Sequence, residues 1–185
     1  MADFNKHFSR KNVPKEQTLM LHGVGFVTGD PTIQIGYPFI LHPSVQVSST
    51  KAGDNKWIYM MLPIPKWSLI THIMIAYKKT GIQNYVSRIR LVEQRDPVSA
   101  TVVHNEIIEK TIPSSCIIST VCHVVVKKSI LLKVCMEFSN EEDLIEFGSV
   151  EVRYIPEYEV SDPEEEMDIR EKNWIQMLSS EKQLS

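Results

Sequence analysis

Cys122 and His123 are adjacent in the sequence, and an imidazole beside a thiol can activate it as a nucleophile. The β-branched residues around them, however, predict a strand, and neighbouring residues of a strand point to opposite faces of the sheet. The two groups therefore cannot readily activate each other, and we interpret both as structural.

The segment GVGFVTG places Gly23, Gly25 and Gly29 in an arrangement similar to a loop that binds the phosphates of a dinucleotide. The third glycine is one position late, and the residues that follow predict a strand and not a helix whose N-terminus could hold phosphate. We therefore expect these glycines to serve a β-bulge or a tight strand end.

The remaining candidates for chemistry are scattered. The six histidines lack the spacing of metal ligands, and the acidic segment at 140–143 is better explained as a solvated turn than as a calcium loop. No P-loop, GxSxG or HExxH motif occurs in the sequence. We predict a protein that is not an enzyme and that holds no cofactor or metal; a hydrolase or metal enzyme, with distant His, Asp and Glu residues converging in the fold, is the less favoured class.

Aromatic side chains are the one feature compatible with ligand binding, because β-sandwiches can bind sugars by stacking them on a Trp or Tyr beside polar groups. Trp57 and Tyr59 are the candidates, since Trp57 follows the turn at 53–56 and can lie at a strand end. Trp67, Tyr77 and Tyr85 fall on faces that the alternation predicts to point inward, so core packing accounts for them better.

Alternation of apolar and polar residues predicts the strands that position these groups. It is clearest at 67–78, 85–91, 130–138 and 150–154, where one face is apolar and the other carries residues such as Arg88, Arg90 and Lys133. The run at 116–128 is apolar on both faces and predicts a central strand ending at a hairpin turn. Less regular strands are expected at 18–27, 32–40, 45–48, 57–62 and 101–110.

Nine or ten strands without intervening helices predict an all-β fold, an antiparallel two-sheet β-sandwich with jelly-roll-like character. The strong helix signal is C-terminal, where Pro163 suits the first turn and an apolar stripe follows. This amphipathic stripe consists of Met167, Trp174, Met177 and Leu178. We expect a basic N-terminal arm at 1–17, a β-sandwich domain at 18–160 and an acidic C-terminal helix and tail at 161–185.

The charge balance, 20 Lys and Arg against 23 Asp and Glu for a net −3, gives no general electrostatic reason to bind nucleic acid or an anionic membrane. The apolar stretch at 55–78 is interrupted by Lys66, and neither half is long enough to span a membrane. Three cysteines without CxxC spacing, together with the absence of a secretory signal, predict a cytoplasmic or otherwise intracellular protein.

The order of features along the chain resembles small uncharacterised β-sandwich domain families from prokaryotes. The resemblance rests on Leu21-His22-Gly23, Trp57, Pro63-Ile64-Pro65 and the strand at 69–79, and it covers about residues 18–155. It implies a sandwich fold and brings no established activity or catalytic residues.

Two hypotheses about function follow. The leading one is a non-enzymatic, homo-oligomeric structural subunit that self-associates through sheet edges and its C-terminal helix, with Met167, Trp174, Met177 and Leu178 binding the partner. Whether that helix docks on its own sandwich or on a neighbour is left open. The alternative is a carbohydrate-binding module that uses Trp57 and Tyr59, which predicts two or more exposed rings beside Asn, Asp or Arg.

Overall fold

The computed structural model describes residues 15–38, 43–81, 83–110 and 114–157. The predicted C-terminal helix and its residues Met167, Trp174, Met177 and Leu178 lie outside the described residues, as does nearly all of the N-terminal arm. Across the described ranges, no helix combines the length and the apolar character that crossing a membrane requires.

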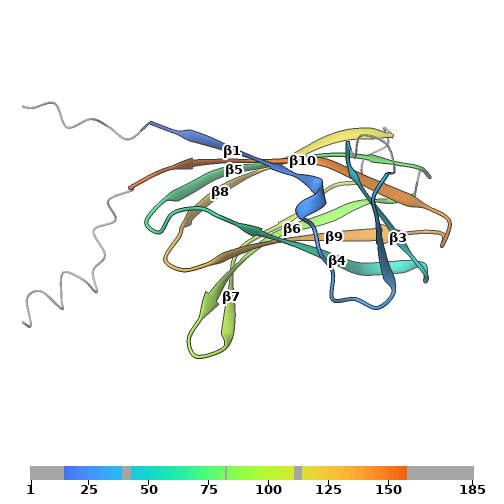
Figure 1. Cartoon of the computed structure of the whole chain (residues 1–185), viewed down its shortest axis with the longest axis horizontal. Helices are drawn as coiled ribbons and strands as arrows, with labels where there is room; N and C mark the ends of the chain where they lie inside the picture. The colour runs from blue at the N-terminus through green and yellow to red at the C-terminus, as the bar shows by residue number, and fades with distance from the viewer. Residues whose placement is uncertain (1–14, 39–42, 82, 111–113, 158–185) are drawn as a thin grey trace, which may run out of the picture.

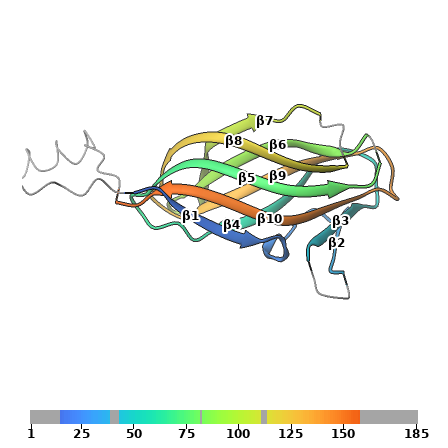
Figure 2. The same cartoon turned by 90° about the horizontal axis from the view of Figure 1, so that it is seen from above.

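The described residues form ten strands in two antiparallel sheets that pack face to face (Figures 1 and 2). The first sheet has the order β2-β3-β10-β5-β8, and β1 also pairs with β10; the second has the order β4-β9-β6-β7. The strands are β1 (Gln17–His22), β2 (Ile33–Gly36), β3 (Val45–Ser49), β4 (Gly53–Leu62), β5 (Leu69–Lys79), β6 (Tyr85–Arg95), β7 (Ser99–Ile107), β8 (Ser115–Val125), β9 (Ile130–Phe138) and β10 (Leu144–Ile155). A 3-10 turn, η1 (Gly23–Gly25), follows β1.

The pairing confirms the predicted jelly-roll sandwich. Strands β3, β4, β5 and β6 pair with β10, β9, β8 and β7 respectively, so the chain runs as one long hairpin whose closed end is the β6–β7 turn. Rolling this hairpin brings β5 against β10 in one sheet and β6 against β9 in the other. This is the strand order of a double-sheet jelly roll.

The core lies between the two sheets and follows the period-two pattern. In β9, Ile130, Leu132, Val134, Met136 and Phe138 are all buried, as the alternation predicts. The Phe147 ring packs between those of Phe26 and Tyr77, with centroids 5.2 and 6.0 Å away. The inward position of Tyr77 is therefore confirmed.

The strand predicted at 18–27 is interrupted by η1, and Gly23 explains why. A Cβ at Gly23 would lie 2.1 Å from the carbonyl oxygen of Phe147, so the backbone of β10 leaves no room for a side chain there. After this turn Phe26 enters the core, and Val27 pairs with Tyr59 at the edge of the second sheet. Gly23 thus serves a tight strand end, where the chain leaves one sheet for the other, whereas a Cβ at Gly25 or Gly29 would make only ordinary contacts.

Two expectations about apolar segments are wrong. Trp67 is not in the core: it is half-buried in the turn before β5, with φ 64°, and the Lys66 Nζ lies 4.4 Å from its ring centroid. The run at 116–128 forms β8, which is an edge strand of the first sheet and not a central one. Its outer face leaves Ile117 and Val121 more than 70% exposed.

Tyr85 also departs from the prediction. Between Val86 and Arg88 the register of β6 against β9 shifts at a β-bulge, which inserts one residue and reverses the faces on either side of it. Val86, Ile89 and Leu91 therefore point inward, and Tyr85 lies half-buried beside Lys110, whose Nζ is 5.8 Å from its ring centroid.

Candidate functional site

The outer face of the second sheet gathers aromatic and cationic side chains in register. This sheet is the lower layer in Figure 1, where β4, β9 and β6 lie below β1, β5 and β10. Residues paired across antiparallel strands point to the same face, so each line of paired residues makes one row across the four strands. The three rows are Trp57-Cys135-Arg88-Ile107, Tyr59-Lys133-Arg90-Asn105 and Met61-Leu131-Val92-Val102.

The middle row holds most of the polar groups. Tyr59, Lys133, Arg90 and Asn105 stand opposite one another on β4, β9, β6 and β7, so with strands about 4.8 Å apart the row spans about 14 Å. The Arg90 Nε donates a hydrogen bond to Oδ1 of Asn105 at 2.9 Å, which orients the guanidinium on the surface. At the far end Val27 pairs with Tyr59 and extends the row by one position.

Trp57 joins two of these rows. It stands opposite Cys135, whose small side chain lets the indole lean across β9 toward β6. The Arg90 Cζ lies 4.9 Å from the indole centroid, and the Lys133 Nζ lies 5.0 Å from it. The same Nζ is 5.2 Å from the ring centroid of Tyr59, so Lys133 contacts both rings through cation–π interactions.

The electrostatics of this face differ from those of the chain as a whole. Its three rows contain three cations, Arg88, Arg90 and Lys133, and no carboxylate. Among the described residues none of the three has an ion-pair partner, and the buried Nε of Arg88 also lacks a hydrogen-bond partner there. Burial, together with the neighbouring charge of Arg90, lowers the pKa of Lys133.

We call this surface the cationic aromatic face and define it by Trp57, Tyr59, Arg88, Arg90, Asn105 and Lys133. Both rings are half-buried and keep part of their surface in solvent, and Asn105 is exposed. Toward the β6–β7 turn, the third row borders a hollow of about 210 Å³ lined by Met61, Leu131 and Val92, among others. The face thus combines planar rings, directed hydrogen-bond donors and an apolar margin.

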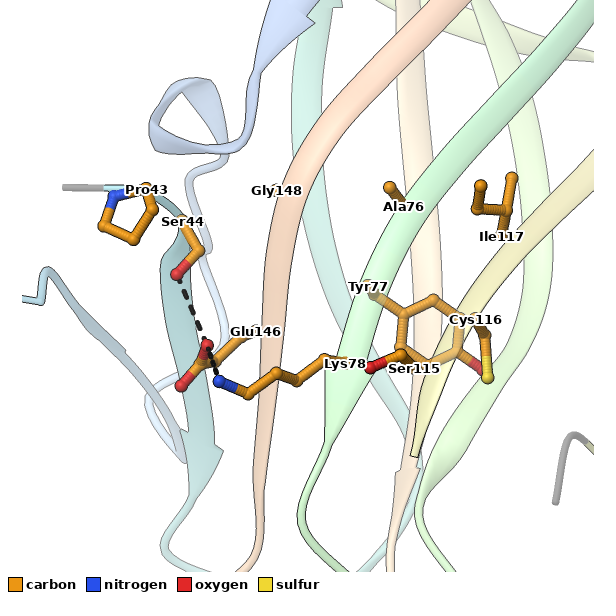
Figure 3. Close-up of a pocket in the computed structure, with 10 residues that line it drawn as sticks. All are labelled: Pro43, Ser44, Ala76, Tyr77, Lys78, Ser115, Cys116, Ile117, Glu146 and Gly148. Carbon is orange, nitrogen blue, oxygen red and sulfur yellow. Dashed lines mark hydrogen bonds and ion pairs between the residues drawn. The ribbon is translucent and has the colours of Figure 1, made fainter. Parts of the chain in front are cut away.

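A larger hollow lies on the opposite side of the molecule, on the outer face of the first sheet (Figure 3). It measures about 550 Å³ and lies where small residues, Ala76 and Gly148, leave space beside Ile117. Its charged lining residues neutralise each other, since the Lys78 Nζ lies 3.0 Å from Oε2 of Glu146. This hollow therefore offers a ligand mainly apolar contacts.

The hydrogen bonds around Glu146 decide its charge state. Burial alone would raise its pKa, but the hydrogen bonds from Lys78 and from Gln46, whose Nε2 donates to Oε1 at 2.8 Å, hold the pKa below its ordinary value. The Ser44 hydroxyl donates a hydrogen bond to Oε2 at 3.5 Å, and Figure 3 marks this contact with a dashed line. The carboxylate is thus ionised and already occupied by the protein's own donors.

The candidates for nucleophilic and metal chemistry, Cys122 and His123 among them, have structural positions in the fold. Cys122 is buried in β8 while its neighbour His123 is exposed on the opposite face, as the alternation predicts. Burial, with the charge of Glu106, raises the pKa of Cys122 to about 12, so the thiol is not a nucleophile near neutral pH. Within the described ranges, no group of three or more His, Cys, Asp or Glu residues could hold a metal ion.

The sequence identified the two rings but not their partners. The alternation of apolar and polar residues already predicts that Arg88, Arg90 and Lys133 point outward, and this is the sequence feature that could have identified them as partners of the rings. What it could not give is the register that sets Lys133 beside Trp57 and Arg90 beside Asn105, because these residues are 76 and 15 positions apart.

No family model matches this chain, and no curated protein matches it. Solved structures are similar to it in fold. They include the CBM36-1 domain of a multidomain xylanase from the hindgut metagenome of Trinervitermes trinervoides, with 9% identity, a TM-score of 0.46 and coverage of 74% of this chain and 96% of that one. The CBM22-1 xylan-binding domain from Paenibacillus barcinonensis has 14% identity, a TM-score of 0.47 and coverage of 74% and 93%. A family 35 carbohydrate binding module from Clostridium thermocellum has 9% identity, a TM-score of 0.46 and coverage of 74% and 97%.

These matches correct the leading hypothesis from the sequence. The solved structures of similar fold are carbohydrate-binding modules and not self-associating subunits, and homo-oligomerisation has no support. At identities this low the likeness is one of fold alone. The ligand and the residues that bind it have to be argued from the surface of this chain.

Proposed function

We propose that this protein is a carbohydrate-binding β-sandwich and that it binds its ligand on the cationic aromatic face. The observation that carries the proposal is the middle row, where Tyr59, Lys133, Arg90 and Asn105 lie side by side next to the Trp57 indole. The alternative hypothesis predicts two exposed rings beside Asn, Asp or Arg; here Asn and Arg lie beside two rings that are half-buried.

The chemistry of the row suits a sugar. The apolar side of a pyranose ring packs against an aromatic ring, while its hydroxyls need donors and acceptors within the same short distance. Here Trp57 and Tyr59 supply the rings, and the Arg90 guanidinium and the Asn105 amide supply directed hydrogen-bonding groups. Because four neighbouring strands hold these groups, the surface is arranged before a ligand arrives, which limits the entropy lost on binding.

An elongated ligand fits this surface better than a small compact one. The row is open along about 14 Å and continues into the apolar margin at Met61, Leu131 and Val92. The proposal includes no catalytic step and no cofactor, and the intracellular location remains a prediction.

The test is binding of the full-length chain to a panel of soluble polysaccharides, measured by affinity electrophoresis and then by calorimetry. We expect Trp57→Ala to weaken binding at least about tenfold, since a partly buried Trp at the centre of a contact carries much of its free energy. Trp67→Ala is the matched control, because Trp67 is also half-buried beside a lysine but lies in the turn before β5.

The variants have to be compared as folded proteins, so thermal unfolding accompanies each titration. Arg90→Gln gives a second probe that leaves both rings in place. If no polysaccharide binds, or if the Trp57→Ala and Arg90→Gln proteins bind as the unmodified chain does, the proposed site is wrong.

A further inference from the structure

The cations of the cationic aromatic face stand next to one another without a carboxylate partner, whereas several cations elsewhere on the described surface are ion-paired and others, such as Lys66 and Lys110, contact aromatic rings. Elsewhere Lys78, Arg95 and Arg153 lie within 2.8 to 3.2 Å of a glutamate oxygen, and Lys128 pairs with Asp96. Arg88, Arg90 and Lys133 have no such partner in the described part of the chain. In a protein of net charge −3, the three rows of this face thus carry three positive charges and no carboxylate, and the nearest carboxylate of the adjoining row, Glu137, pairs with Tyr85.

The geometry makes these positive charges costly without a ligand. Lys133 and Arg90 stand directly opposite each other on β9 and β6, and like charges in that position repel. Each is held in place, the lysine by two aromatic rings and the arginine by Asn105. An anionic group above the pair would remove the repulsion and gain charge-assisted hydrogen bonds from both.

The rings themselves favour a charged sugar over a neutral one. Two cations lie within about 5 Å of the Trp57 centroid, so an anionic group on a sugar that packs against the indole would lie close to both of them, whereas a neutral sugar would leave their charges unpaired. An acidic sugar can pack against the half-buried ring and bring its anionic group to the cations beside it. A guanidinium suits this task, because its planar fork matches a carboxylate or a sulfate.

We infer that the ligand of this face is an acidic polysaccharide, whose sugars carry carboxylate or sulfate groups that bind between Arg90 and Lys133. The inference rests on the carbohydrate-binding function proposed above and specifies its ligand class.

Single-stranded nucleic acid is the main rival, because it also offers anions and stacking rings. A groove that follows such a backbone needs positive charge along its whole length, whereas the third row here is Met61, Leu131, Val92 and Val102. The observations therefore favour the polysaccharide.

The experiment measures calorimetric binding of the full-length chain to matched ligands. These are a polyuronate, the same polymer after carboxyl reduction, a sulfated galactan, an oligothymidylate and polyglutamate. We expect the polyuronate or the sulfated galactan to bind at least tenfold more tightly than the reduced polymer, and the binding to weaken between about 50 and about 300 mM salt. The two acidic ligands separate carboxylate from sulfate recognition.

The variants are Lys133→Met and Arg90→Gln, with Lys78→Met as the matched control on the opposite sheet. The first two are expected to lose at least tenfold in affinity for the acidic polymer, and the control is expected to lose none. If the neutral polymer binds equally well and depends on Trp57, the inference fails and the proposed function stands. If no polysaccharide binds, both fail. Tighter binding of oligothymidylate, or equal binding of polyglutamate, also overturns the inference.

Discussion

Lys133 and Trp57 come from neighbouring strands, and the Lys133 Nζ lies 5.0 Å from the centroid of the Trp57 indole. The ammonium is partly dehydrated by the rings of Trp57 and Tyr59 and faces Arg90 across the sheet. Burial, and after it the charge of Arg90, lowers the pKa of Lys133. The two aromatic contacts favour the charge on Lys133, and burial and Arg90 oppose it, whereas Lys78, Arg95 and Arg153 are paired with glutamates.

Gly23 is a position where the fold excludes any side chain. We expect Gly23→Ala to lower the free energy of unfolding by about 2–3 kcal/mol, because its Cβ would lie 2.1 Å from the Phe147 carbonyl oxygen and backbone atoms would have to move. Gly36→Ala is the matched control. Its Cβ would meet Gln46 at an ordinary 4.0 Å, and alanine in a strand is expected to raise stability by about 0.5 kcal/mol. Urea unfolding measures both, and equal effects would contradict the packing argument.

Glu93 anchors the turn between β8 and β9. Its side chain is buried, its Oε1 accepts hydrogen bonds from the backbone N–H groups of Lys127 and Lys128 at 2.8 and 3.2 Å, and its Oε2 lies 3.2 Å from Arg95. We expect Glu93→Gln to cost about 1–2 kcal/mol in unfolding free energy, because charge-assisted bonds in a buried place are weakened.

The control for Glu93 is Glu151→Gln, which breaks a more exposed contact with Arg153 at 2.8 Å and is expected to cost less than about 0.5 kcal/mol. Guanidinium unfolding at neutral pH compares the two variants. If Glu151→Gln proves as destabilising as Glu93→Gln, burial is not what gives Glu93 its effect.

The sequence predicts the sandwich because its inward residues repeat with period two over whole strands, as Ile130 to Phe138 do in β9. It misplaces residues where that period is interrupted. A bulge near Ser87 turns Tyr85 outward, and a positive φ places Trp67 in a turn. It also assigns β8 a central place, because an edge strand with exposed Ile117 and Val121 has the same composition as a buried one.

What the sequence can predict of the candidate site is limited for a different reason. Trp57 and Tyr59 are recognisable as residues, and the outward faces of Arg90 and Lys133 follow from alternation. Their meeting depends on β4, β9 and β6 being neighbours, which the rolled hairpin determines through pairings that are distant in sequence. Local patterns carry no information about such register, so the cationic aromatic face emerges only with the fold.

Cys122 links the stability of the fold to alkaline pH. Burial raises its pKa to about 12 from the ordinary 9.0, so between these values the unfolded chain releases a proton that the folded chain keeps. The contribution of Cys122 to stability is therefore complete below about pH 9 and is lost as pH rises toward 12, at no more than about 1.4 kcal/mol per pH unit.

The measurement compares the unmodified chain with Cys122→Ala by urea unfolding from pH 8 to about pH 11. We expect the difference between their unfolding free energies to shrink as pH rises. Both proteins contain the same other titratable groups, so the contributions of those groups cancel in this difference. Slow alkylation of Cys122 in the folded protein, compared with the urea-unfolded chain, is the second readout. A difference that stays constant with pH would contradict the assignment.

Lys133→Met tests whether the lysine serves binding and not stability. The thioether keeps the stem packed between Trp57 and Tyr59, and its contacts with aromatic rings are similar in size to the cation–π interactions that are lost. The substitution also removes the cost of dehydrating the Lys133 ammonium and the repulsion between that ammonium and the Arg90 guanidinium. We therefore expect the free energy of unfolding to be no lower than that of the unmodified chain, while affinity for the acidic polymer falls.

The matched control is Lys56→Met, because the Lys56 Nζ donates a hydrogen bond to Oγ1 of Thr32 at 2.6 Å in a mostly buried place. There the same substitution removes a satisfied interaction and is expected to cost about 1 kcal/mol, with no loss of ligand affinity. Thermal and urea unfolding, run beside the calorimetric titrations, separate the two lysines. If Lys133→Met destabilises the protein as much as Lys56→Met does, Lys133 is a structural residue, and its loss of affinity would reflect a damaged fold.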